Sequence, residues 1–269
     1  MTTTPTNTAS ANPASSTTGH PALAQYVTGL GDDALVLSHR LAEWITNAPQ
    51  LEEDLALANI SLDLLGQART LLSYAGEVEG KGRTEDDLAY LRSEREFRNL
   101  QLVEIPNGDF AVTIARQLII SAYQFELYTA LLSSADETLA ALAAKAIKEV
   151  DYHRDHATQW TLRLGDGTEQ SHARMQVALE ATWPYVEELF DPTDIARELA
   201  ALPGVAVDPS TLRESWTAYV RPVLVEATMP EPQPNRRSRG GRRGLHTEYL
   251  GHMLAEMQIL HRAHPGVTW

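Results

Sequence analysis

The chain of 269 residues is long enough for one large domain, and its 43% hydrophobic and 22% charged residues are typical of a globular protein. Its 36 Asp and Glu residues outnumber its 22 Lys and Arg residues. The net charge of −14 argues against nucleic acid or an anionic membrane as a partner, because both need a basic surface. The absence of cysteine excludes disulfides, thiolate nucleophiles and Cys-ligated metals, and it fits a cytoplasmic location.

Residues 1–21 consist mostly of Thr, Ser, Ala, Asn and Pro, with neither the basic start nor the apolar run of a signal peptide. Such a composition buries too little apolar surface to fold, and it predicts a disordered tail. Residues 22–269 are expected to form a single helical domain. No later apolar run approaches the roughly 18 residues that a transmembrane helix needs.

Apolar residues recur with the period of an α-helix through most of the remaining chain, and no segment alternates convincingly as a strand does. The expected helices cover 32–47, 50–75, 84–101, 109–134 and 140–164, followed by shorter ones near 171–190, 194–202, 208–228 and 245–263. Thr84 and Asp87 have the spacing of a capping box. Pro184 is expected to disturb the helix that contains it. The fold class is therefore all-α, a long-helix bundle with additional C-terminal helices.

The helix expected over 140–164 places ionisable groups on its apolar side. Glu149, His153 and His156 lie on or beside the face formed by its leucines and alanines. Glu126 lies in the middle of the apolar face of the helix over 109–134. Buried carboxylates and imidazoles need partners, so this pattern indicates either half of a metal site or a polar network in the core.

The spacing of these residues favours the polar network. A carboxylate-bridged dimetal site in a four-helix bundle uses two Glu-x-x-His pairs. The only such pair here is Glu169 and His172, directly after a Gly-Asp-Gly turn, and the helix over 50–75 contains no histidine. We therefore expect Glu149 and His153 to satisfy one another's hydrogen bonds, with Glu126 or Tyr152 as a further member. The polar stripe of the helix over 50–75 is expected to face water or a partner chain.

Residues 230–244 form a basic segment in an otherwise acidic chain. They include the run NRRSRGGRRG, which predicts a mobile loop. Arg242 and Arg243 are candidates for contacts with a coenzyme A phosphate or with an acidic partner. The alternative is that the loop is only a solvated linker.

Several long runs resemble the C subunit of the phenylacetyl-CoA epoxygenase family of bacterial multicomponent monooxygenases. These runs are LVLSHRLAEW, EEDLALANISLDLLGQAR, LVEIPNGDFAVTIARQ, AKAIKEVDYH and GLHTEYLGHMLAEMQILHR, and the resemblance covers about residues 22–269. It implies a ferritin-like bundle that pairs with a homologous catalytic A subunit, which holds the di-iron site and binds the acyl-CoA. It also implies reductase and accessory subunits.

The expected function is that of a structural subunit without catalytic residues or a cofactor of its own. Its role would be to support epoxidation of the aromatic ring of phenylacetyl-CoA in phenylacetate catabolism. The alternative is an independent dimetal-carboxylate oxygenase that uses Glu126, Glu149, His153 and His156.

Overall fold

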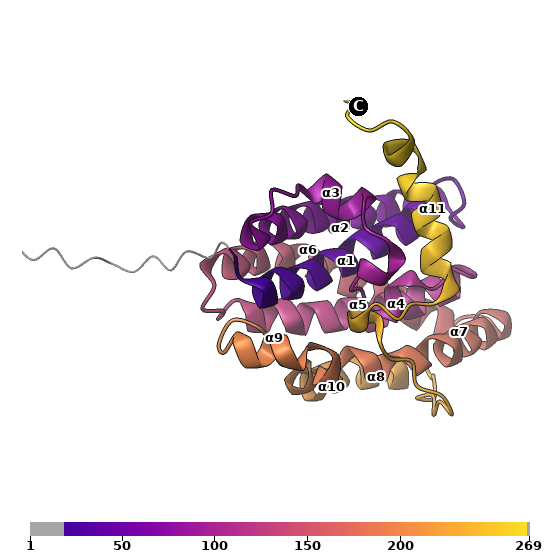
Figure 1. The fold of residues 1–269 in the computed structure, drawn as a ribbon. Coiled ribbons are helices and arrows are strands. Elements are labelled where there is room, and N and C mark those ends of the chain that lie inside the picture. Colours follow the sequence, from indigo (N-terminus) through magenta and orange to yellow (C-terminus); the bar gives the residue numbers. More distant parts are fainter. Residues whose placement is uncertain (1–18, 268–269) are drawn as a thin grey trace, which may run out of the picture.

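In this computed structural model, which describes residues 19–267, four long helices run side by side and form the bundle (Figure 1). They are α1 (Pro21–Ala42), α2 (Leu51–Glu79), α5 (Phe110–Leu131) and α6 (Glu137–Gly165). The described residues contain no strand. The prediction of an all-α, ferritin-like helical bundle is confirmed.

The first helix begins earlier than the sequence pattern predicted. It starts at Pro21 instead of Asp32, and the His20 side chain accepts a hydrogen bond from the backbone N–H of Leu23. Leu23 and Val27 are buried, so the apolar face extends through this first part. Most of the predicted disordered tail, residues 1–18, lies outside the described residues.

Helix α2 is held at both ends by local signals. Its first turn carries three acidic residues, which suit the positive end of a helix dipole, and Gly80 ends it in the left-handed conformation. The predicted bounds of 50–75 agree closely with Leu51–Glu79. In contrast, the helix predicted over 84–101 is wrong in extent. The capping box of Thr84 and Asp87 opens only the short α3 (Glu85–Tyr90), and irregular chain leads to α4 (Gln101–Glu104).

The C-terminal part adds shorter helices around the bundle. They are α7 (Glu169–Thr182), α8 (Val186–Leu189), α9 (Ala196–Ala201), α10 (Arg213–Glu226) and α11 (Glu248–Ala263). A 3₁₀ turn over Trp183–Tyr185 separates α7 from α8, as expected from Pro184. Helices α7 and α10 pack on α5 and α6, whereas α11 crosses at one end of the bundle next to α3 (Figure 1). No helix in the described part is long and apolar enough to span a bilayer.

Candidate functional site

Two histidines of α6 face α2, and each of them meets one carboxylate there. His153 is 1% exposed, and its Nε2 atom lies 3.1 Å from Asp63 Oδ2. His156 Nε2 lies 2.8 Å from Oε2 of Glu53, which is also buried. Glu53 and Asp63 stand about 15 Å apart along the axis of α2, at 1.5 Å per residue. The two imidazoles therefore have separate partners.

Glu149 belongs to a third contact between the same helices. The Gln67 side-chain amide donates a hydrogen bond of 2.9 Å to Glu149 Oε2, and the Tyr128 hydroxyl on α5 donates one of 3.1 Å to Gln67 Oε1. Burial raises the pKa of the Tyr128 hydroxyl, which keeps it protonated as a donor. The polar groups of α6 thus pair with α2 and not with one another, contrary to the prediction.

Within the described residues, Glu126 forms no hydrogen bond or ion pair with these histidines. Its side chain is half-buried, and burial raises its pKa while the nearby Arg154 charge opposes that shift. The Arg154 guanidinium in turn stacks over the rings of Phe125 and Tyr219, at 3.5 and 4.3 Å. Tyr152, the other suggested partner, is 51% exposed. Neither side chain completes the cluster that the sequence suggested.

These contacts give the buried polar groups hydrogen-bond partners, and they do not bring several metal-ligating side chains to one point. Within residues 19–267, no group of three or more His, Asp or Glu side chains is placed to hold a metal ion. A dimetal site needs carboxylates and imidazoles converging from four helices. Here α2 supplies one carboxylate to each histidine and an amide to Glu149. The exception is Nδ1 of His156, which is buried without a hydrogen-bond partner among the described residues.

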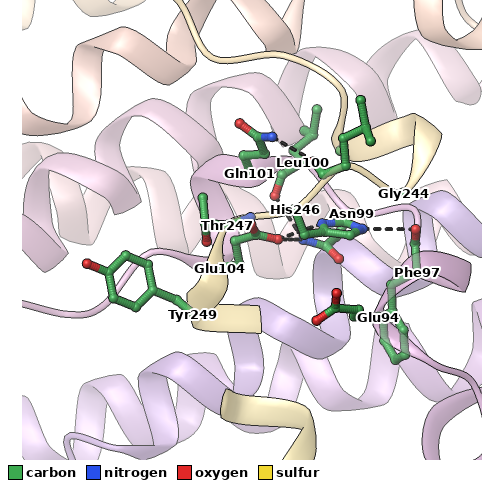
Figure 2. A network of polar contacts seen from close by, with 12 residues as sticks. Glu94, Phe97, Asn99, Leu100, Gln101, Glu104, Gly244, His246, Thr247 and Tyr249 are labelled. Carbon is green, nitrogen blue, oxygen red and sulfur yellow. Dashed lines mark hydrogen bonds and ion pairs between the residues drawn. The ribbon is translucent and has the colours of Figure 1, made fainter. Parts of the chain in front are cut away.

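A second polar cluster lies at α4, where the C-terminal chain crosses the bundle, and Figure 2 shows it. His246 Nδ1 lies 2.7 Å from Glu104 Oε2, and His246 Nε2 donates a hydrogen bond of 3.0 Å to the carbonyl of Phe97. The Asn99 side-chain amide donates to the same Glu104 oxygen, and the backbone N–H of Thr247 donates to the other. The Glu104 side chain is fully buried. These contacts therefore satisfy a carboxyl group that water does not reach.

The basic segment lies against the bundle through ion pairs. We call residues 237–247 the crossing segment. The Arg242 side chain is only 11% exposed and donates hydrogen bonds to Asp33 (2.6 Å) and to the carbonyl of Gly29 (2.7 Å). The other pairs are Arg237–Glu187 (3.6 Å), Arg239–Asp191 (2.9 Å) and Arg243–Asp194 (2.8 Å). Residues 237–243 of the predicted loop thus contact the bundle, while the mobility of the loop stays a prediction. Arg242 is turned into the protein, whereas Arg243 stays at the surface with its side chain 54% exposed.

Two buried carboxylates that hold this segment were missed by the sequence reasoning. Glu188 accepts hydrogen bonds from the backbone N–H groups of Gln101 (2.8 Å) and Gly241 (2.7 Å). Burial raises the pKa of Glu188 to about 7 and that of Asp33 to about 6, although Arg242 opposes both shifts. The available signal was the acidic run EELFDPTD at 187–194, opposite in charge to the arginine run.

Comparisons with known proteins agree with the resemblance to the phenylacetyl-CoA epoxygenase family that the sequence showed. A family model described as "Phenylacetic acid catabolic protein" matches residues 1–269. The C subunit of the 1,2-phenylacetyl-CoA epoxidase of Escherichia coli (strain K12) is 54% identical over 247 residues, which cover 92% of this chain and 99% of the relative. With a match to the whole chain and a relative of this similarity, the chain belongs to the family of phenylacetic acid catabolic proteins.

Proposed function

We propose that this chain is the structural, non-catalytic subunit of a multicomponent monooxygenase that epoxidises the aromatic ring of phenylacetyl-CoA. The relative in Escherichia coli is named as the C subunit of such an epoxidase, which supports the reaction and the membership of a complex. The observation that carries the non-catalytic role is the pairing of His153 and His156 with one carboxylate each. Histidines paired in this way stabilise the contact between α2 and α6.

The proposed partners follow from the same assignment. The homologous catalytic A subunit would hold the di-iron centre and the acyl-CoA, with accessory and reductase subunits completing the complex. This chain would hold no cofactor and would act through its interface. The cytoplasmic location expected from the sequence stays a prediction.

A reconstitution experiment tests the proposal. The chain is purified alone and together with the catalytic subunit, and iron content and oxygen-dependent epoxidation of phenylacetyl-CoA are measured. We expect iron well below one ion per chain in this subunit, and epoxidation that requires its presence. The variant His153→Gln retains a hydrogen-bonding side chain and should support epoxidation as well as the unchanged chain does.

The competing function is an independent dimetal-carboxylate oxygenase using Glu126, Glu149, His153 and His156. The position of Glu126 beside Arg154 does not favour it. Near-stoichiometric iron in the chain alone, lost in the His153→Gln variant, would nevertheless establish a metal site and overturn the structural role.

A further inference from the structure

Helix α2 carries a row of exposed leucines, which we call the leucine stripe: Leu51, Leu55, Leu62 and Leu65. Their side chains are 70, 59, 64 and 43% exposed. Their spacings of four, seven and three residues put them on one face of the helix, over about 21 Å of its length. Long apolar side chains are normally buried, and an aligned row of them at the surface indicates a contact surface for another protein.

Gly66 lies beside the leucine stripe and is not explained by the packing of this chain. Glycine in the interior of a helix is less favourable than alanine. A Cβ atom at Gly66 would meet no atom within 4 Å, whereas one at Gly76 of the same helix would lie 2.2 Å from the carbonyl oxygen of Arg83. The chain itself therefore requires Gly76 but not Gly66. A glycine facing open space beside exposed leucines suits the close approach of another backbone.

The charges next to the leucine stripe indicate the chemistry of what covers it. A shallow groove between α2 and α6 is lined by Gly66, Thr70, Leu142 and Lys145, so the surface continues onto α6. Lys145 is exposed there, and it forms no ion pair or hydrogen bond within the described part of the chain. By contrast, Arg69 on α2 pairs with Glu85. An unpaired lysine at the rim complements an acidic side chain of a partner.

We propose that the leucine stripe receives an amphipathic helix of the catalytic subunit. The apolar face of that helix packs on Leu55 and Leu62, its backbone approaches Gly66, and an acidic residue on its flank faces Lys145. The inference rests on the proposed function, because it takes the partner to be the catalytic subunit of the same complex.

Binding of the full chain to the purified catalytic subunit tests the proposal by titration calorimetry. Gly66→Gln places a bulky side chain in open space, so the chain should fold normally while the complex weakens about tenfold or more. The matched control is Ala181→Gln, an exposed position on α7, which should bind as the unchanged chain does. The double variant Leu55→Ser/Leu62→Ser should weaken binding further. Circular dichroism and urea unfolding verify that each variant is folded.

The outcomes separate this inference from the proposed function. If the unchanged chain binds no catalytic subunit, the proposed function fails and the inference fails with it. If the unchanged chain binds and the folded Gly66→Gln and leucine variants bind equally well, the assignment of the surface is wrong while the proposed function stands. If the leucine stripe mediates only self-association, seen as a dimer of this chain that the leucine variant dissociates, the proposed occupant is wrong.

Charge reversal gives a separate check on the partner's chemistry. Lys145→Glu should weaken the complex several-fold at low salt and less at high salt, because screening removes the repulsion. Unchanged affinity at low salt would contradict the acidic flank.

Discussion

His246 Nδ1 lies 2.7 Å from Glu104 Oε2, and this contact joins the crossing segment to α4 in the interior (Figure 2). The other ring nitrogen donates to the carbonyl of Phe97, so the protonated, positively charged ring can donate from both nitrogens. Burial disfavours that charge, but the hydrogen bond to Glu104 and its negative charge outweigh burial and raise the pKa of His246. The start of α11 is thereby tied to the bundle.

Removing the His246 ring should destabilise the protein strongly. His246→Ala leaves the fully buried Glu104 without the imidazole that pairs with it, and breaking a buried pair in this way costs about 3 kcal/mol. His252→Ala on the exposed side of α11 is the control and should change the free energy of unfolding by less than about 0.5 kcal/mol. Urea unfolding measures both, and equal effects of the two variants would contradict the interpretation.

Among the arginines of the crossing segment, Arg242 should contribute most to the free energy of unfolding. Arg242→Met leaves Asp33 buried without its ion pair, so the free energy of unfolding should fall by about 3 kcal/mol. Arg236→Met changes an exposed side chain and should have an effect within about 0.5 kcal/mol. Thermal or urea unfolding distinguishes them. A loss below about 1 kcal/mol for Arg242→Met would argue that the segment is held mainly by other contacts.

The two buried carboxyls predict a decline in stability as the pH rises. Burial raises the pKa of Asp33 to about 6 and that of Glu188 to about 7, so the folded chain keeps protons that the unfolded chain has lost. Proton binding by the folded state makes the free energy of unfolding fall with increasing pH. This contribution is complete below the unfolded pKa of about 4 and is lost as the pH passes about 6 for Asp33 and about 7 for Glu188.

Asp33→Asn and Glu188→Gln test that pH dependence. Each variant removes one titrating group, so the fall in urea midpoint between pH 5 and 8 should become less steep than in the unchanged chain. His246 contributes with the same sign, because its pKa is also raised, and it is present in all three proteins. Identical slopes in all three would show that these carboxyls do not titrate in this range.

Two glycines of α2 should respond in opposite ways to the same substitution. Gly76→Ala puts a Cβ atom 2.2 Å from the carbonyl oxygen of Arg83, so the backbone must shift and the protein should lose about 2 kcal/mol or more. Gly66→Ala meets open space and should stabilise the isolated chain by about 0.5–1 kcal/mol. Urea unfolding compares them, and a destabilising Gly66→Ala would mean that the chain itself needs this glycine.

The positions of α2, α5, α6 and α11 could be predicted well, whereas the start of α1 and the short helices α3 and α4 could not. Helix α6 has a strong apolar periodicity and begins at the Asp136 cap, and α2 has an acidic first turn and ends at Gly80. Such signals are local in the sequence and can be read before the fold is known. The segment after α3 carries Phe97 and Leu100 in an apolar pattern, but both are buried in irregular chain. Apolar content alone does not distinguish a short helix from a packed loop.

The sequence by itself determined the all-α class and the inward position of Glu149, His153 and His156, because helical periodicity can be read from the order of residues. It also determined the family, because long runs of matching residues identify it. Only the tertiary structure decided the partners of those residues. Glu53 and Asp63 belong to a helix distant in the sequence, and the direction of their side chains depends on how α2 packs on α6. The same reason explains Arg242. The composition of the surrounding segment suggested a solvated loop. The position of Arg242 opposite Asp33 depends on how the crossing segment packs against α1.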